Sequence, residues 1–555
     1  SVRMNGTDFW DDGNDEKECQ HIARYLESLG VASLNVSSGS YESGWSIIEP
    51  YPYQEGWKKH LAKGIKECVH IPVIAVNTVK HPAHAEAMLE EGVSDFVGVA
   101  RGNLCDPEFG NKAKRGDDAR VRKCIGCMNC FKQAGLGRAI ECAVNPVLGR
   151  ETYRGDDKLV KNGDGRTVAV IGAGPSGLQA AITLAKRGFK VVVFEKSDRI
   201  GGNMNLAAVP PCKGLISEFI ETLGIEAADL GIDIRLNTPG TVEAAKAVGA
   251  VGVVIAAGGI DIIPQVDGID KAYTYRQVLK NEVELKGKKI AVIGGGLTGL
   301  ETAEYLSDFD NEVSVIEMAP AVGTAMYRSV TDAVVGHITK NGGHIMTGTM
   351  FKAVGDGFVT LNSLATGYDT DALFDACVIA MGVKPNDAIV AEFEAAFDKV
   401  AVVGDIAHSR VCGSLIPALK IMGCETYAVA PGTLLPPAPE VLGCDHVTSD
   451  LDSVLPELDV VYMLRVQQER LEGAPFPTIR EYHKLFGLTK DREKLMKPDA
   501  IICHPGPINR GVEFDSYMAD HPQRSVILEQ VYAGICVRMA ILYLLLGGAD
   551  NGLAS

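Results

Sequence analysis

Four cysteines stand within twenty residues of the sequence, in the stretch KCIGCMNCFKQAGLGRAIEC at positions 123–142. Cys124, Cys127 and Cys130 recur at every third position, and Cys142 follows twelve residues later. A structural zinc site usually pairs two short C-x2-C knuckles across a longer gap, whereas a triplet with a distant fourth cysteine typically holds an iron–sulfur cubane. The spacing therefore favours a [4Fe-4S] cluster, with zinc or a disulfide as the alternatives.

Two glycine-rich stretches each follow an apolar strand-like run, precede a helical pattern and end in an acid. In each, the glycines allow a tight turn and let a pyrophosphate approach the helix N-terminus, while the carboxylate binds ribose hydroxyls. The first comprises Gly172, Gly174, Gly177 and Glu195, with Gly202 shortly after it; the second comprises Gly294, Gly296, Gly299 and Glu317. This nesting predicts an FAD site followed by an inserted nicotinamide dinucleotide site.

Glu317 determines which nicotinamide the second site prefers. Its carboxylate accepts hydrogen bonds from a free ribose 2′-hydroxyl but repels a 2′-phosphate, and no arginine or lysine follows in MAPAVG. We therefore expect NADH rather than NADPH. The alternative is a degenerate site that binds only ADP or nothing.

Alternating strand and helix patterns fill residues 1–115 and must position what lies at the strand ends. Helices are expected at 16–29, 57–68 and 83–91, between four strand-like runs. Such repeats indicate parallel βα units, and four of them are half of an eight-fold barrel of about 250 residues. The last run leads into GVARGNLCDPEF, so Arg101 stands at the strand end where barrels bind phosphate.

This order of barrel, cysteine segment and two dinucleotide-binding folds resembles the old yellow enzyme family over residues 1–403, in the branch of trimethylamine dehydrogenase and 2,4-dienoyl-CoA reductase. The resemblance implies FMN, with Arg3 at the flavin pyrimidine edge and Ala100, Arg101 and Gly102 at its phosphate. A surface salt bridge is the alternative for Arg101. Tyr41 lies where that branch contacts substrate, or else faces solvent in a loop; the first half of the barrel, with the family's proton-donating tyrosine, is absent.

A cluster between two flavins has a simple chemical purpose. A hydride donor delivers two electrons at once, whereas an iron–sulfur cubane passes one at a time. FAD would split the pair, and the cluster would relay single electrons to FMN. We therefore expect electrons to pass from NADH to FAD, the cluster and FMN, and then to a small unsaturated or amine-bearing substrate.

After residue 403 the sequence pattern changes, and the motifs HSR, RVQ and HPGP occur among strand-like and helical runs. Residues 400–555 resemble the aspartate-binding domain of aspartate carbamoyltransferase. The resemblance places six residues around the two substrate carboxylates, which suit the planar fork of arginine. They are Arg410, Arg465, Gln467, Pro505, Gly506 and Pro507.

Gly404 and Asp405 mark the junction, because both resembled families have a Gly-Asp there. In the flavoprotein reading the Asp405 carboxylate reaches the ribityl chain of FAD. Three origins of this junction are open: a natural fusion, an engineered join or a mis-joined reading frame. The join of two partial segments favours the latter two, and an opening at Ser1 without Met suggests that something upstream is missing.

The predicted architecture is α/β throughout: a partial (β/α)8 barrel, nested FAD- and NAD-binding Rossmann-like domains, and a doubly wound aspartate-binding domain. The expected boundaries are 1–115 for the half barrel, 116–165 for the cluster segment, 166–286 for FAD, 287–386 for NAD(P)H, 387–405 for the strand that closes the FAD sheet, and 400–555 for the aspartate domain.

Composition limits the classes of partner. A formal net charge of −17 with no basic stripe argues against nucleic acid, and the apolar run at 539–546 is too short to span a membrane. We expect a cytoplasmic homo-oligomer that acts on small molecules. Two other functions are kept: carbamoyl transfer by the C-terminal part, although the S-T-R-T loop that transfer requires is missing from the sequence, or a tail that only binds ligand or promotes oligomerisation.

Overall fold

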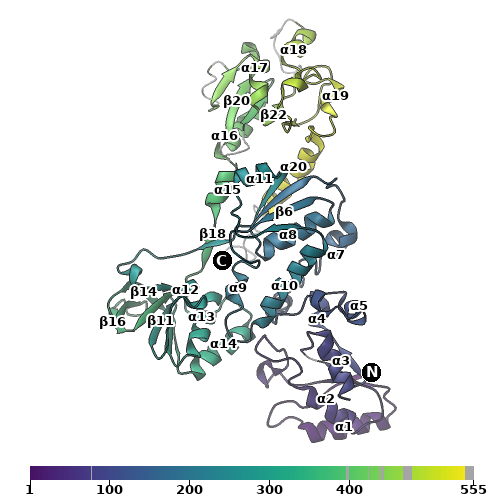
Figure 1. The fold of residues 1–555 in the computed structure, drawn as a ribbon, viewed down its shortest axis with the longest axis vertical. Helices are drawn as coiled ribbons and strands as arrows, with labels where there is room; N and C mark the ends of the chain where they lie inside the picture. The colour runs from purple at the N-terminus through teal and green to yellow at the C-terminus, as the bar shows by residue number, and fades with distance from the viewer. Residues whose placement is uncertain are drawn as a thin grey trace. The chain divides into compact units, whose positions relative to one another are not determined.

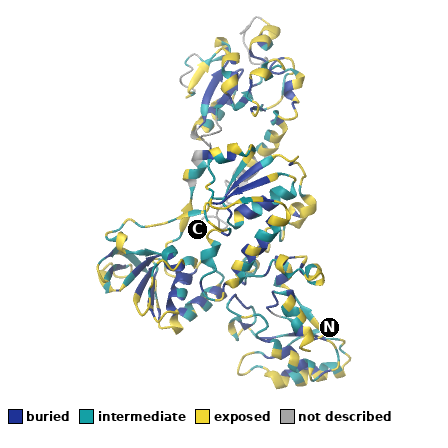
Figure 2. Ribbon diagram, in the orientation of Figure 1, coloured by how far each residue is buried: buried dark blue, intermediate teal, exposed yellow. Residues whose placement is uncertain are grey.

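The chain divides into two units, residues 1–386 and 387–555. The structure, a computed structural model, describes residues 1–76, 78–394, 399–422, 424–436, 438, 443–466 and 478–543. The central strands of the Rossmann-like parallel sheets are largely buried, whereas the strands at the sheet edges are partly exposed (Figures 1 and 2). Among the described residues no helix is long and apolar enough to cross a membrane.

The first unit opens with a parallel sheet in the order β1-β2-β3-β4. Its strands are β1 Val2–Asn5, β2 Leu34–Ser37, β3 Val73–Val76 and β4 Phe96–Gly98, connected through helices α1 Glu16–Ser28, α2 Lys59–Lys66 and α3 Pro82–Glu90. Asp15 caps α1 by accepting from the Glu18 backbone N–H, and the Glu18 side chain returns the bond in a capping box. The expected βα units are confirmed, and β1 and β4 are the two edges of the sheet.

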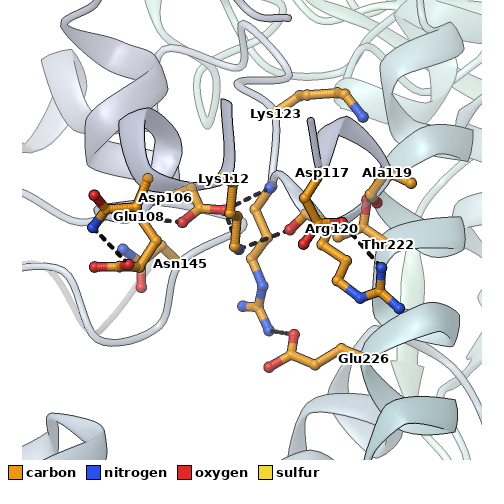
Figure 3. Close-up of polar contacts among 12 residues, drawn as sticks. Asp106, Glu108, Lys112, Asp117, Ala119, Arg120, Lys123, Asn145, Thr222 and Glu226 are labelled. Carbon is orange, nitrogen blue, oxygen red and sulfur yellow. Dashed lines mark hydrogen bonds and ion pairs between the residues drawn. The ribbon is translucent and has the colours of Figure 1, made fainter. Parts of the chain in front are cut away.

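The cysteine segment joins this sheet to the next domain through short helices: α4 Arg101–Cys105, α5 Phe109–Lys114, α6 Asn129–Gly135 and α7 Glu151–Arg154. Charged contacts anchor it on both sides (Figure 3). On the barrel side, Asp106 accepts from the Lys112 Nζ at 2.6 Å and from the Arg122 backbone N–H at 3.0 Å. On the other side, the Arg122 guanidinium donates to Glu226 at 2.5 Å.

The first dinucleotide-binding domain has a parallel sheet in the order β7-β6-β5-β8. Its elements are β5 Thr167–Ile171, α8 Pro175–Lys186, β6 Lys190–Phe194, α9 Met204–Ala207, α10 Gly214–Asp229, β7 Asp233–Arg235, α11 Val242–Ala247 and β8 Ala250–Ile255. Central strand β5 is apolar and almost wholly buried, as a strand covered on both faces requires.

The second dinucleotide-binding domain repeats the pattern with the order β10-β17-β11-β12-β13. Its parallel sheet and helices are β10 Tyr273–Thr274, α12 Tyr275–Leu279, β11 Lys289–Ile293, α13 Leu297–Ser307, β12 Glu312–Ile316, α14 Arg328–Lys340, β13 His344–Met346 and β17 Ala376–Ile379. An antiparallel sheet of β14 Thr349–Val354, β15 Phe358–Ser363 and β16 Asp369–Leu373 packs beside it, and a ribbon of β9 Gly259–Asp261 with β18 Val383–Pro385 connects the two domains.

The second unit is a doubly wound parallel sheet in the order β21-β20-β19-β22-β23. Its strands are β19 Lys399–Val403, β20 Glu425–Val429, β21 His446–Thr448, β22 Val460–Met463 and β23 Ile501–Cys503. Its helices are α15 Asp387–Glu394, α16 Cys412–Ile421, α17 Leu451–Val454, α18 Ile479–Phe486, α19 Ser516–Ala519 and α20 Ile527–Tyr543.

Strand β19 differs from the sequence-based expectation. The sequence predicts that residues 387–405 close the FAD sheet, but β19 pairs with β20 on one side and β22 on the other, in the second unit. Val400 and Val402 are buried in that sheet, whose core surrounds the strand. With both backbone edges hydrogen-bonded there, β19 has no edge left for the FAD sheet, in which β8 pairs with β5 alone among the described strands.

Candidate functional site

The four predicted cluster ligands lie around one small cavity in the first unit. Its walls are otherwise mostly apolar, with Leu104, Ile125, Met128, Ala143 and Val144 among them. Gly126 and Met128 both adopt positive φ, 66° and 61°, so the chain winds tightly between the cysteines. The cavity measures about 20 Å³, roughly one water, and among the described residues no His, Cys, Asp and Glu side chains already form a metal-binding group. The four thiols that line this cavity are the donor set that an iron–sulfur cubane requires.

A fifth cysteine, which the spacing analysis did not single out, lines the same cavity. Cys105 ends helix α4, and its Sγ lies 3.6 Å from the Sγ of Cys142. Hydrogen bonding with Cys105 lowers the pKa of Cys124 to about 6 and that of Cys142 to about 7, while the pKa of Cys105 is raised. Thiolates are the metal-binding form, so this arrangement prepares two ligands. The spacing of the other cysteines cannot identify Cys105, because Cys105 lies earlier in the chain, in the barrel part.

A larger cavity of about 390 Å³ lies next to the cysteines at the carboxyl ends of the four barrel strands. Arg3, Ala100 and Arg101, predicted as FMN contacts, all line it, and Gly102 is buried directly after them. Cys124 and Arg101 line both cavities, so the two spaces share a wall.

The side chain of Arg101 is engaged by protein groups. Its guanidinium donates to the Glu49 carbonyl at 2.6 Å and pairs with the Glu49 carboxylate at 3.3 Å. Glu49 also pairs with Lys58 at 2.5 Å, and because the Glu49 side chain is only 3% exposed, the ion pair of Arg101 is a buried one rather than the surface salt bridge kept as the alternative. The backbone at Ala100 and Gly102 remains the part of this site that is suited to phosphate.

Other polar groups of the larger cavity suit a ligand. Buried Asn35 Oδ1 and Thr78 Oγ1 have no hydrogen-bond partner among the described residues. Buried Lys80, which follows β3, also lines the cavity, and desolvation lowers the pKa of its amine. Because unpaired buried polar atoms are costly, these groups suit a ligand that carries hydrogen-bond donors and an anion. Tyr41 is 92% exposed and does not line this cavity.

The first glycine-rich turn has the geometry that its sequence predicts. Gly172 has φ 104°, and a Cβ at Gly177 would collide with the carbonyl oxygen of Gly172, so both positions require glycine. Helix α8 begins just after Gly174, and Gly202, with φ 53°, packs against Gly174. Buried Glu195 accepts from the Ala173 backbone N–H at 2.7 Å, which holds the carboxylate beside the turn.

The second turn repeats this arrangement. Gly294 has φ 114°, and a Cβ at Gly299 would collide with the Gly294 carbonyl oxygen, while Gly296 precedes helix α13. Glu317 accepts from the backbone N–H groups of Gly295 at 2.6 Å and Ala319 at 2.7 Å. Each domain therefore presents a helix N-terminus, a glycine turn and a carboxylate together, as a dinucleotide requires.

In the second unit the predicted aspartate-site segments gather at one edge of the sheet. Exposed Arg410 follows β19, Arg465 follows β22, and the Pro505–Pro507 loop follows β23, three neighbouring parallel strands. Ligands bind at this carboxyl edge in open α/β sheets. The Gly506–Pro507 bond is cis, and Gln467 lies outside the described residues. Gly404 has φ 128°, and buried Asp405 accepts from the His408 Nδ1 at 2.8 Å, within this unit.

Glu513, which the sequence analysis missed, connects two of these segments. Its fully buried carboxylate accepts from the Val466 backbone N–H at 2.7 Å and from the Asn509 backbone N–H at 2.9 Å. It thereby holds the residue after Arg465 against the loop that follows β23. Only its place in RGVEF, close after HPGP, gives a sequence signal.

Comparison with protein families divides the chain into three parts. Residues 1–119 match the NADH:flavin oxidoreductase / NADH oxidase family, and residues 166–405 match the pyridine nucleotide-disulphide oxidoreductases. Residues 398–545 match the Asp/Orn binding domain of aspartate/ornithine carbamoyltransferase. The last two matches overlap at 398–405, which contains β19 and the Gly-Asp junction.

Individual relatives agree with this division. An NADH oxidase of Thermoanaerobacter brockii is 38% identical over 59% of this chain and 51% of its own length. An aspartate carbamoyltransferase catalytic subunit of Syntrophotalea carbinolica is 54% identical over 27% of this chain and 47% of its own. The solved 2-naphthoyl-CoA reductase complex is similar at a TM-score of 0.67 with 28% identity, covering 70% of this chain and 59% of that one. The chain thus spans about half the length of these curated relatives.

Proposed function

Since the chain joins an NADH:flavin oxidoreductase segment, a pyridine nucleotide-disulphide oxidoreductase segment and a carbamoyltransferase aspartate-binding segment, we propose that its activity is NADH-dependent reduction of a small unsaturated or amine-bearing molecule. The wall that Cys124 and Arg101 form between the cysteine cavity and the larger cavity carries this proposal. Two redox groups on either side of one side chain are close enough to exchange electrons.

The residues divide the task as follows. The glycine turns at Gly172 and Gly294 hold pyrophosphates, and Glu195 and Glu317 bind ribose hydroxyls. The cysteines hold the cluster, and the cavity behind Cys124 takes FMN. A bound nicotinamide supplies two electrons together, a flavin handles one or two, and a cubane passes one.

NADH is the proposed donor because Glu317 stands beside the second glycine turn, hydrogen-bonded to the Gly295 backbone. A carboxylate fixed there repels a ribose 2′-phosphate. Substrate would bind on the open side of the FMN cavity, which Tyr41 in the loop after β2 does not line.

A second function is proposed for the second unit: binding of aspartate or a related dicarboxylate. The main support for this proposal is Glu513. Its carboxylate accepts two backbone hydrogen bonds, which hold the Arg465 and Pro505–Pro507 segments at one edge of the sheet. The chain lacks the S-T-R-T loop of carbamoyl transfer, so we propose ligand binding without turnover. The carbamoyltransferase relative is named a catalytic subunit, which is part of a larger assembly, and we propose that this chain assembles as well.

The experiment for the main proposal is an anaerobic NADH titration of protein reconstituted with FAD, FMN, iron and sulfide. FAD absorbance should bleach first, followed by the electron paramagnetic resonance signal of a reduced cluster. Protein that binds stoichiometric zinc and no iron, or a cluster that stays oxidised while FAD is reduced, would contradict the proposal.

A further inference from the structure

We propose that Cys105 is a positioning residue that donates an S–H···S hydrogen bond to the ligand sulfur of Cys142 and raises the reduction potential of the cluster. The inference rests on the proposed [4Fe-4S] cluster at the four spaced cysteines. It assigns a role to a fifth cysteine that the spacing motif does not contain.

The distance between the two sulfurs excludes a disulfide and is within the reach of an S–H···S hydrogen bond. A disulfide requires about 2.05 Å, whereas Cys105 Sγ and Cys142 Sγ are 3.6 Å apart. Two thiolates on separate corners of one cubane repel each other and stand further apart than sulfurs in contact. A thiol that donates to a thiolate accounts for 3.6 Å directly. Cys142 follows the triplet in the motif and is the ligand, so Cys105 is the donor.

The fold holds Cys105 in this place. The Asn145 side-chain amide donates to the Leu104 carbonyl at 2.9 Å, which ties the chain after Cys142 to the end of α4. Arg122 donates to the Val144 carbonyl at 3.1 Å on the same stretch. Cys105 is only 4% exposed, and water is therefore a poor competitor for its S–H.

The effect on the cluster follows from charge. Reduction adds an electron whose density spreads onto the ligand sulfurs, and a hydrogen bond to one of them stabilises the reduced state. Removing that bond makes the cluster harder to reduce. We expect the reduction equilibrium to shift by roughly threefold to tenfold, and a tenfold change is about 59 mV for one electron.

The test compares full-length Cys105→Ala, Cys105→Ser and Cys142→Ala after anaerobic reconstitution. Cys105→Ala should keep the iron content of the parent protein and show a lower midpoint potential in a titration followed by electron paramagnetic resonance. Cys105→Ser, which retains an O–H donor, should recover part of the shift. Cys142→Ala should lose iron. Cys19→Ala is the matched control, because Cys19 is equally buried in the barrel part but lies outside the cavity.

Each other outcome has a definite meaning. An unchanged potential in Cys105→Ala overturns the hydrogen bond. If Cys105→Ala loses the cluster while Cys142→Ala keeps it, Cys105 is the cluster ligand. That outcome also overturns the proposed hydrogen bond. Failure of the parent protein itself to bind iron would instead refute the proposed cluster, and with it the main function.

Discussion

The Tyr51 hydroxyl donates a hydrogen bond to the Oε2 of Glu304 at 3.0 Å, although the two residues are 253 positions apart. Tyr51 lies in the loop between β2 and α2, and its backbone packs against Gly126 between the cysteines. Glu304 lies on α13, the helix that starts at the second glycine turn. The bond therefore connects the cysteine segment to the nicotinamide-binding domain through a buried contact.

Glu304 should make stability depend on pH. Burial raises its pKa to about 7 from an ordinary 4.5, although the Tyr51 hydroxyl and His337 favour the charged form. The folded protein therefore keeps a proton that the unfolded chain loses, and the stabilisation present below pH 4.5 decreases until about pH 7. Glu304→Gln removes this titration. From pH 5 to pH 8 the free energy of unfolding should fall in both proteins. The fall in Glu304→Gln should be smaller than the fall in the parent by on the order of 2 kcal/mol.

Chemical denaturation at a series of pH values checks this difference. Glu312→Gln, at an exposed position of β12 in the same domain, is the control and should follow the parent curve. Parallel curves for Glu304→Gln and the parent would show that Glu304 does not titrate in this range.

Removing a cluster ligand should remove the iron. We expect anaerobically reconstituted protein to bind about four irons per chain, and Cys127→Ala or Cys130→Ala to lose most of it, because a cubane needs a thiolate at each corner. Iron and zinc analysis of both variants gives the answer. Full iron content in either variant would show that the spaced cysteines are not the ligands.

The nicotinamide preference should depend on Glu317. NADH should reduce bound FAD at least about tenfold faster than NADPH at equal low concentration, because a fixed carboxylate repels the 2′-phosphate. Glu317→Gln should lower this ratio of the two reduction rates, because it weakens the binding of NADH more than that of NADPH. Anaerobic stopped-flow absorbance measures both rates. Equal rates of FAD reduction by the two nucleotides in the parent, or faster reduction by NADPH, would contradict the assignment of NADH as the preferred donor.

Buried Lys80 should help hold the FMN phosphate. Lys80→Met should weaken FMN binding by roughly tenfold to a hundredfold, the usual value of a charge-assisted hydrogen bond, and leave riboflavin binding nearly unchanged. Fluorescence titration with both flavins separates the phosphate from the ring. Lys66→Met, a surface lysine paired with Asp95, is the control.

Succinate should bind to the second unit without any transfer reaction. Arg465→Ala should weaken binding by about tenfold or more, because arginine meets a carboxylate with two hydrogen bonds. Isothermal titration measures this, with Arg480→Ala, at an exposed position of α18, as the control. A colorimetric assay should detect no carbamoyl aspartate. Turnover that survives removal of host carbamoyltransferase would show that the chain holds a complete transferase site.

Local pattern was enough to predict most of the fold. The glycine turns, the apolar strands and the βα periodicity each depend on neighbouring residues, so Gly172, Gly294 and helix α1 appear where the sequence places them. The assignment of β19 to the FAD sheet was wrong, although the expected aspartate domain includes this strand, because an apolar strand fits two sheets equally well and pairing partners are not encoded locally. Cys105 and Lys80 were missed for a related reason, since only the folded chain brings them to the cavities.

In the part of the chain that the structure describes, β8 pairs with β5 on one side only, which makes β8 a strand through which molecules can associate. A strand hydrogen-bonded on one side presents a row of free amide and carbonyl groups, which is a template for a strand of another molecule. Val251 is 60% exposed on β8, and no charged residue interrupts AVGVVI. Concentrated or warmed protein should therefore aggregate through β8, and a lysine at position 251 should delay turbidity without touching either redox cavity.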